Sequence, residues 1–172
     1  MIVLGSFLSC KKNEPLNKAV KIQDVLTQNS AEETEASFFI AASDLTKSII
    51  VNSQRAQREV TKGSVREFSF SLVNNQNLLL QAINKEAFNQ LIIITDFNIV
   101  VNNDQFTSFD EGKADFDQYY MSSVIALLSK QIELFESVSK ATQNTSILKL
   151  ILYYLPKQYQ LLREAKKIKT NL

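Results

Sequence analysis

Segment 116–138 is the part of this 172-residue chain that most constrains its fold. Charged residues such as Lys130, Glu133 and Glu136 fall outside its apolar positions, which recur at steps of three or four. This spacing places the apolar residues on one side of an α-helix. Burial contributes roughly 25 cal/mol per Å², so a face of this length is stable only when similar elements cover it. The apolar positions are Phe116, Tyr120, Val124, Leu127, Leu128, Ile132, Phe135 and Val138.

Three other segments have matching apolar faces and predict three further helices. We expect the first from about Ser30 or Thr34 to Thr61, the second over residues 65–88, and the last from about 145 onward. Only three glycines and two prolines argue against a turn-rich β-sandwich. The sequence therefore predicts an all-α, up-down four-helix bundle over residues 34–170. The apolar faces comprise Phe38, Ala42, Leu45, Ile49, Ala56 and Val60; Val65, Phe68, Leu72, Leu79 and Ile83; and Ile147, Ile151, Leu155, Leu161, Leu162, Ala165 and Ile168.

The first turn between helices is predicted at residues 62–64. Gly63 suits the left-handed position that ends many helices, and Ser64 with Glu67 matches a capping box for the second helix. Because this turn is short, the first two helices should be antiparallel neighbours.

A long connection is predicted between the second and third helices. Residues 91–95 and 99–101 are rich in β-branched residues without helical periodicity. Extended chain covers about 3.3 Å per residue against 1.5 Å in a helix, so this connection can return along the whole length of a helix. A lengthwise crossover and a local β-hairpin both fit the pattern.

The fourth helix carries two local signals. Asn144 or Thr145 is a plausible cap at its start. Pro156 lies in its middle, where proline removes a backbone hydrogen bond, so we expect a kink or a break near Tyr153.

The N-terminus combines a short apolar run, Cys10 and a polar stretch that begins at Lys11. This arrangement resembles the signal and lipobox of a bacterial lipoprotein. The resemblance implies a signal over residues 1–9, cleavage before Cys10, acyl chains on that cysteine, and a polar tether over residues 10–33. The alternative is a frayed N-terminus with an ordinary thiol. The apolar run is too short to span a bilayer.

Composition argues against several classes of function. The chain has no histidine, one cysteine and a net charge of +1. Without histidine it lacks the usual general base and the commonest metal ligand. It has no basic excess to bind nucleic acid, no Gly-x-Ser-x-Gly elbow and no phosphate-binding glycine loop. We therefore expect no catalytic residue, metal ligand or cofactor.

Several polar residues fall on or near the predicted apolar faces and could form a hydrogen-bonded layer inside the bundle. An unpaired buried amide costs about 1–3 kcal/mol, so these side chains need one another or water. Such a layer would either specify helix register or be the relic of a metal or ligand site. The remaining alternative is that these side chains are simply partly exposed. The candidates are Asn52 (or Ser53), Asn75, Gln76, Gln131 and Gln158.

The four segments together resemble a family of secreted, ferritin-like four-helix bundles described as predicted outer-membrane proteins, a domain of unknown function. The resemblance covers about residues 38–167. It implies a ferritin-like bundle with the long connection between helices two and three. The residues that carry it are Val65 and Phe68, Phe116-Asp117 with Tyr120, Leu134-Phe135, and Leu155-Pro156.

The family pattern also has histidines on helices two, three and four. In this chain an Asp-His pair is replaced by Asn75 and Gln76, and the other two positions hold Leu128 and Leu161, or Gln160 in place of Leu161 if the register shifts by one. We therefore expect this chain to differ from its relatives at that site.

These observations favour a non-catalytic lipoprotein of the cell envelope, at the outer membrane and facing the periplasm. It would bind or support another envelope component, with the membrane as its partner through Cys10. The first alternative is a metal-binding or redox bundle that uses carboxylates only, for which Glu133 and Glu136 have helical spacing. The second is a cytosolic helical adaptor without lipid.

Overall fold

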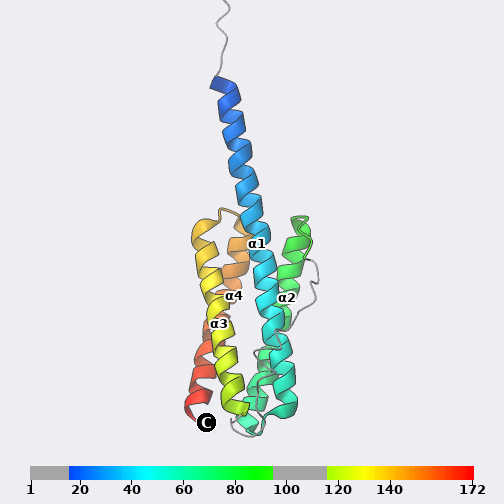
Figure 1. The fold of residues 1–172 in the computed structure, drawn as a ribbon, viewed down its shortest axis with the longest axis vertical. Coiled ribbons are helices and arrows are strands. Elements are labelled where there is room, and N and C mark those ends of the chain that lie inside the picture. The colour runs from blue at the N-terminus through cyan, green and yellow to red at the C-terminus, as the bar shows by residue number, and fades with distance from the viewer. Residues whose placement is uncertain (1–15, 95–115) are drawn as a thin grey trace, which may run out of the picture. The chain divides into compact units, whose positions relative to one another are not determined.

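The computed structural model describes residues 16–94 and 116–172, with side chains described from Glu33 onward (Figure 1). It contains four helices: α1 (Leu16–Glu59), α2 (Gly63–Asn89), α3 (Phe116–Ala141) and α4 (Thr145–Thr170). No strand occurs in these ranges, so the prediction of an all-α four-helix bundle is confirmed. The chain divides into two units between Glu33 and Thr34, and the bundle is the unit that runs to Leu172.

Contacts between helix ends define the direction of each helix in the bundle. Asp117, at the start of α3, accepts a hydrogen bond from the amide of Thr61, just before α2 begins (2.9 Å). Asn144, just after α3, donates to the side chain of Gln90, just after α2 (3.2 Å). Helices α2 and α3 therefore run in the same direction, and α4 returns beside both of them (Figure 1).

The connection between α2 and α3 consequently joins opposite ends of the bundle. This is the arrangement that a lengthwise crossover requires. Residues 95–101, which carry part of the alternative β-hairpin hypothesis, lie outside the described residues.

The bundle core consists of two apolar clusters. One contains residues such as Val65, Phe68, Tyr120 and Leu161, and lies towards the turn between α1 and α2. The other lies towards the opposite end and is built around Phe38, Phe39, Leu79, Ile83, Phe135 and Ile147. Each helix contributes residues to both clusters, so the two halves of the core together bury the predicted apolar faces.

The predicted ends of the first two helices are partly wrong. Helix α1 begins at Leu16, well before the expected start near Ser30 or Thr34. Gly63 does not adopt a left-handed conformation and is instead the first residue of α2. The N-cap residue of α2 is Lys62, which makes no side-chain capping bond, so the predicted capping box at Ser64 is also wrong.

Asp117 organises this turn from another helix. Its carboxylate is fully buried and accepts hydrogen bonds from the amides of Thr61 (2.9 Å) and Lys62 (2.6 Å) and from the Thr61 hydroxyl (3.1 Å). A buried carboxylate needs such donors to offset the loss of water. The turn is therefore held by a residue more than fifty positions later in the chain.

The start of α4 follows the prediction. Asn144 is the N-cap, and its side-chain oxygen accepts hydrogen bonds from the amides of Ser146 (2.9 Å) and Ile147 (3.3 Å). We expected a kink or a break near Tyr153, and the break does not occur, because α4 is continuous from Thr145 to Thr170 with Pro156 inside it. Pro156 lies on the exposed side of α4, and so does Leu152, whose carbonyl loses its partner and can bond to water.

Among the described helices, none contains an apolar stretch long enough for a membrane span.

Candidate functional site

A layer of four buried polar side chains separates the two apolar clusters. Each helix contributes one: Thr46 from α1, Gln76 from α2, Gln131 from α3 and Gln158 from α4, all 0% exposed. Along every helix the layer residue lies between the residues of one cluster and those of the other. We call these four residues the amide layer.

The side chains of the amide layer bond to one another. Gln76 and Gln131 form a reciprocal amide pair, with Nε2 to Oε1 distances of 3.3 and 3.2 Å. Gln76 also donates to Gln158 Oε1 (2.7 Å), and Gln131 donates to Thr46 Oγ1 (2.8 Å). The Thr46 hydroxyl donates in turn to the carbonyl of Ala42 (2.7 Å). The nitrogen of Gln158 has no hydrogen-bond partner among the described residues.

The structure brings together three of the five residues predicted for an interior layer. Asn75 instead donates to the carbonyl of Ser71 within α2 (2.8 Å). Asn52 is buried on α1 but does not bond to these glutamines, while its neighbour Ser53 accepts a bond from Tyr120 (3.0 Å). Sequence reasoning missed Thr46, although it lies four residues after Ala42 and three before Ile49 on the predicted apolar face of the first helix.

The positions that the family resemblance assigns to histidines lie at or next to this layer. Gln76 belongs to it. Leu128 lies one helical turn before Gln131, and Leu161 lies one turn after Gln158; both leucines are buried in the apolar cluster near the α1–α2 turn. In this chain, therefore, neutral and apolar side chains occupy these positions.

The pKa values of Tyr120, Tyr154 and Tyr159 are raised in the bundle. Burial raises the pKa of Tyr120, and the hydrogen bond to Ser53 acts in the opposite direction. Tyr159 donates a hydrogen bond to Glu136, and this bond raises the pKa of the tyrosine. Burial, together with the nearby Tyr153, raises the pKa of Tyr154. In each case the neutral hydroxyl is the favoured form, which does not suit a tyrosine nucleophile.

No group of three or more histidine, cysteine, aspartate or glutamate side chains is arranged to hold a metal ion within the described ranges. Glu133 is exposed, and Glu136 accepts the hydrogen bond from Tyr159. Cys10, the predicted lipidation site, lies outside the described residues.

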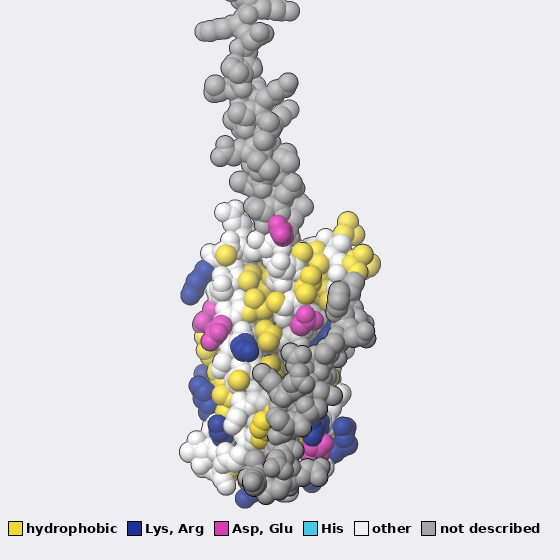
Figure 2. Space-filling model, in the orientation of Figure 1, with side chains coloured by type: hydrophobic (Ala, Val, Ile, Leu, Met, Phe, Trp, Pro, Cys, Tyr) yellow, Lys and Arg dark blue, Asp and Glu magenta, His cyan; other side chains and the backbone are white. Residues whose placement is uncertain are grey.

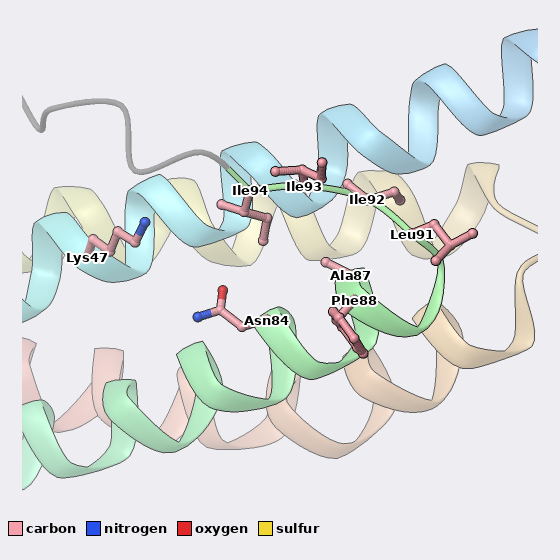
Figure 3. Close-up of a pocket in the computed structure, with 8 residues that line it drawn as sticks. All are labelled: Lys47, Asn84, Ala87, Phe88, Leu91, Ile92, Ile93 and Ile94. Atoms are coloured by element: carbon pink, nitrogen blue, oxygen red, sulfur yellow. The ribbon is translucent and has the colours of Figure 1, made fainter.

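An apolar pocket lies at the C-terminal end of α2 (Figure 3). Its volume is about 570 Å³, within the range of roughly 300–1,000 Å³ that is usual for small-molecule sites. Helix α1 contributes Lys47, α2 contributes Asn84, Ala87 and Phe88, and the chain that follows α2 contributes residues 91–94. Figure 2 shows hydrophobic side chains gathered over this end of α2, at the upper right.

The chain reverses at Leu91 to form one wall of this pocket. The amide of Ile92 donates to the carbonyl of Ala87 (2.9 Å) and that of Leu91 to the carbonyl of Phe88 (3.0 Å), the pair of bonds typical of a Schellman cap. Leu91 has a φ of 59° and is the only non-glycine residue with positive φ in the described part of the chain. Glycine or asparagine usually occupies this position, because other side chains cost about 1 kcal/mol or more there.

Exposure alternates along the residues that follow Leu91. Ile92 and Ile94 pack against the core cluster around Phe135, which holds the segment in place. Phe88, Leu91 and Ile93 are 77%, 88% and 81% exposed. Sequence reasoning noted the non-helical apolar run at 91–95 but did not identify it as a pocket wall, because an apolar run does not show which of its residues face solvent.

Comparisons with known proteins add no relative: no protein-family model, curated protein or solved structure matches this chain.

Proposed function

We propose that this chain is a non-catalytic, lipid-anchored protein of the bacterial cell envelope whose four-helix bundle binds an apolar ligand in the pocket at the end of α2. The bundle would be ferritin-like, an interpretation supported by the parallel direction of α2 and α3 and by the connection between their opposite ends. Cys10 would carry the lipid and hold the protein at the outer membrane, facing the periplasm, as the N-terminal pattern implies.

Leu91 is the observation that carries the binding proposal. Its left-handed conformation costs free energy, and its side chain is 88% exposed, so it contributes little to the core. Backbone strain at an exposed apolar residue that lines a pocket points to a role in binding. The neighbouring Phe88 and Ile93 extend the same apolar surface.

The amide layer supports a non-catalytic role for the interior. Its side chains are neutral, and the four N–H groups of Gln76 and Gln131 already donate to other members of the layer. Groups of this kind do not take up or release protons near neutral pH. The layer instead links four helices at one level, which suits the specification of helix register.

Leu91→Asn tests the binding proposal. The probe is Nile red, a neutral fluorescent dye, and the protein is the full chain with Cys10→Ser to avoid lipid attachment. We expect Leu91→Asn to weaken dye binding by about tenfold, because burying a leucine contributes roughly 1.5–3 kcal/mol. Stability in urea should remain unchanged or rise, since asparagine tolerates the left-handed conformation better than leucine.

Leu152→Asn is the matched control. Leu152 is 73% exposed, but it lies on α4 and does not line the pocket. Dye binding should be the same as in the parent protein. If both variants weaken binding equally, or if neither does, the pocket is not the binding site.

A further inference from the structure

We infer that the amide layer binds one internal water molecule, which is held by the side-chain nitrogen of Gln158. This water lies in the interior of the bundle, and its binding does not depend on the apolar pocket at the end of α2. Its site is defined by the way in which the three glutamines share their donors and acceptors.

The N–H groups of the amide layer are unevenly used. A glutamine side chain has two N–H donors and one carbonyl oxygen with two lone pairs. Gln76 and Gln131 each donate both N–H groups to other members of the layer. The nitrogen of Gln158 donates to no described residue, although this side chain is 0% exposed. Two buried N–H groups therefore need an acceptor, and both belong to the same nitrogen.

Turning the Gln158 amide over does not supply that acceptor. Its Oε1 accepts from Gln76 Nε2 at 2.7 Å, the shortest of the bonds between the glutamines. If the oxygen and the nitrogen of Gln158 exchanged places, two N–H donors would face each other, and one N–H of Gln76 would lose its acceptor. The bond from Gln76 thus fixes which end of the Gln158 amide lacks a partner.

The free energies favour a bound water over an unpaired nitrogen. A buried donor without an acceptor costs about 1–3 kcal/mol, whereas immobilising a water molecule costs about 0–2 kcal/mol. The water can also donate in turn. Gln131 Oε1 accepts a single bond within the layer, from Gln76, so it keeps a lone pair for a further donor. Buried waters are typically found where several polar groups of this kind need partners.

Other classes of ligand suit these groups less well. The layer consists of one threonine and three glutamines, so a buried anion would have no cation to pair with, and burying an unpaired charge costs far more than burying a neutral molecule. The N–H groups of Gln158 repel a metal cation, and an apolar molecule would leave them unpaired. Water is the smallest neutral molecule that accepts their hydrogen bonds.

Water-detected NMR of the full chain carrying Cys10→Ser tests this inference. In a ROESY spectrum, dipolar transfer from a bound water and chemical exchange with the solvent give cross-peaks of opposite sign. We expect a dipolar cross-peak between water and the side-chain N–H groups of Gln158, because a water enclosed by fully buried groups stays longer than surface water. A crystal structure should place the water oxygen roughly 2.7–3.2 Å from Gln158 Nε2.

Two variants sharpen the test. Asn75→Leu changes an amide that bonds within its own helix, so the cross-peak should remain, and its loss would assign the water to Asn75 instead. Replacing Gln76, Gln131 and Gln158 together by leucine should leave no water at this level of the bundle in the crystal. A water that persists there would be held by other groups, which contradicts the inference.

The parent protein alone is also decisive. A missing dipolar cross-peak at Gln158, or a protein acceptor found within hydrogen-bond distance of Gln158 Nε2 in the crystal, would overturn the inference. Neither result affects Nile red binding in the pocket, so the proposed function is tested separately.

Discussion

Tyr120 is the largest side chain that the bundle buries completely, and its hydroxyl donates to Ser53 Oγ at 3.0 Å. Burial raises its pKa above the ordinary value of 10.0. The folded protein therefore keeps this proton at a pH where the unfolded chain has lost it. The stabilisation that Tyr120 contributes through its raised pKa is present in full below pH 10.0. It is lost as the pH rises towards the pKa of the folded state.

This difference predicts alkaline destabilisation. Above about pH 10 the free energy of unfolding should fall by up to roughly 1.4 kcal/mol per pH unit from Tyr120. Tyr120→Phe should lack this component, at a cost of about 1 kcal/mol at neutral pH for the lost hydrogen bond. Urea unfolding across pH measures both effects. Tyr153→Phe, at a 75% exposed residue, should keep the full alkaline slope; the same slope in Tyr120→Phe would contradict the assignment.

Single residues also mark the limit of sequence analysis. Asn144 was predictable as a cap because its bonds reach only two and three residues along the chain. Asp117 was not predictable as the residue that holds the α1–α2 turn, because its partners, Thr61 and Lys62, become neighbours only when α3 packs beside them. Leu91 was missed for a related reason, since a leucine in the left-handed position contradicts local preference.

At the scale of elements, the amide layer connects all four helices. Gln76 and Gln131 hydrogen-bond to each other. Gln76 also donates to Gln158 of α4, and Gln131 donates to Thr46 of α1. The two apolar clusters lie on either side of the layer, so shifting one helix by a turn would place an amide among their leucines and phenylalanines. The layer therefore selects one register for the bundle.

Replacing one glutamine of this layer should destabilise the bundle more than replacing all three glutamines. Gln131→Leu leaves the side-chain oxygen and one N–H of Gln76 without a partner, and it removes the bond that Gln131 donates to Thr46. This should lower the free energy of unfolding by about 1–3 kcal/mol. Substituting Gln76, Gln131 and Gln158 together by leucine should restore most of this loss, because no amide remains unpaired and Thr46 still bonds to Ala42. Urea unfolding measures each variant.

Asn75→Leu serves as the comparison for the layer variants, because Asn75 bonds within its own helix and is only partly buried. It should change stability by less than about 1 kcal/mol. If the triple variant loses as much free energy of unfolding as the three single variants together, the glutamines do not act as a network.

At the scale of the whole molecule, the N-terminal sequence pattern predicts that lipid is attached to Cys10. In cells that process lipoproteins, labelled palmitate should be incorporated into the protein, and Cys10→Ser should abolish the label. Acyl chains contribute about 0.8 kcal/mol per buried CH₂ to membrane binding, so Cys10→Ser should also move the protein from the membrane to the soluble fraction. Ser9→Ala, which keeps a small residue before the cysteine, should still be labelled.

Cys10 is the only cysteine of the chain, so a thiol-linked acyl label can attach only to Cys10. Palmitate labelling that persists in Cys10→Ser would contradict Cys10 as the lipid site. Membrane fractionation that Cys10→Ser leaves unchanged would favour the cytosolic adaptor hypothesis.

The sequence by itself determined the four helices, most of their bounds and the apolar faces that close the core. These follow from periodicity, a local property that each segment carries alone. It also marked Gln76, Gln131 and Gln158 as polar residues on buried faces. Tertiary structure alone decided that these three meet Thr46 in one layer, that Asp117 holds a distant turn, and that Leu91 and Ile93 remain exposed. Each of these depends on which helix faces overlap in space, and that is set by packing between segments far apart in the chain.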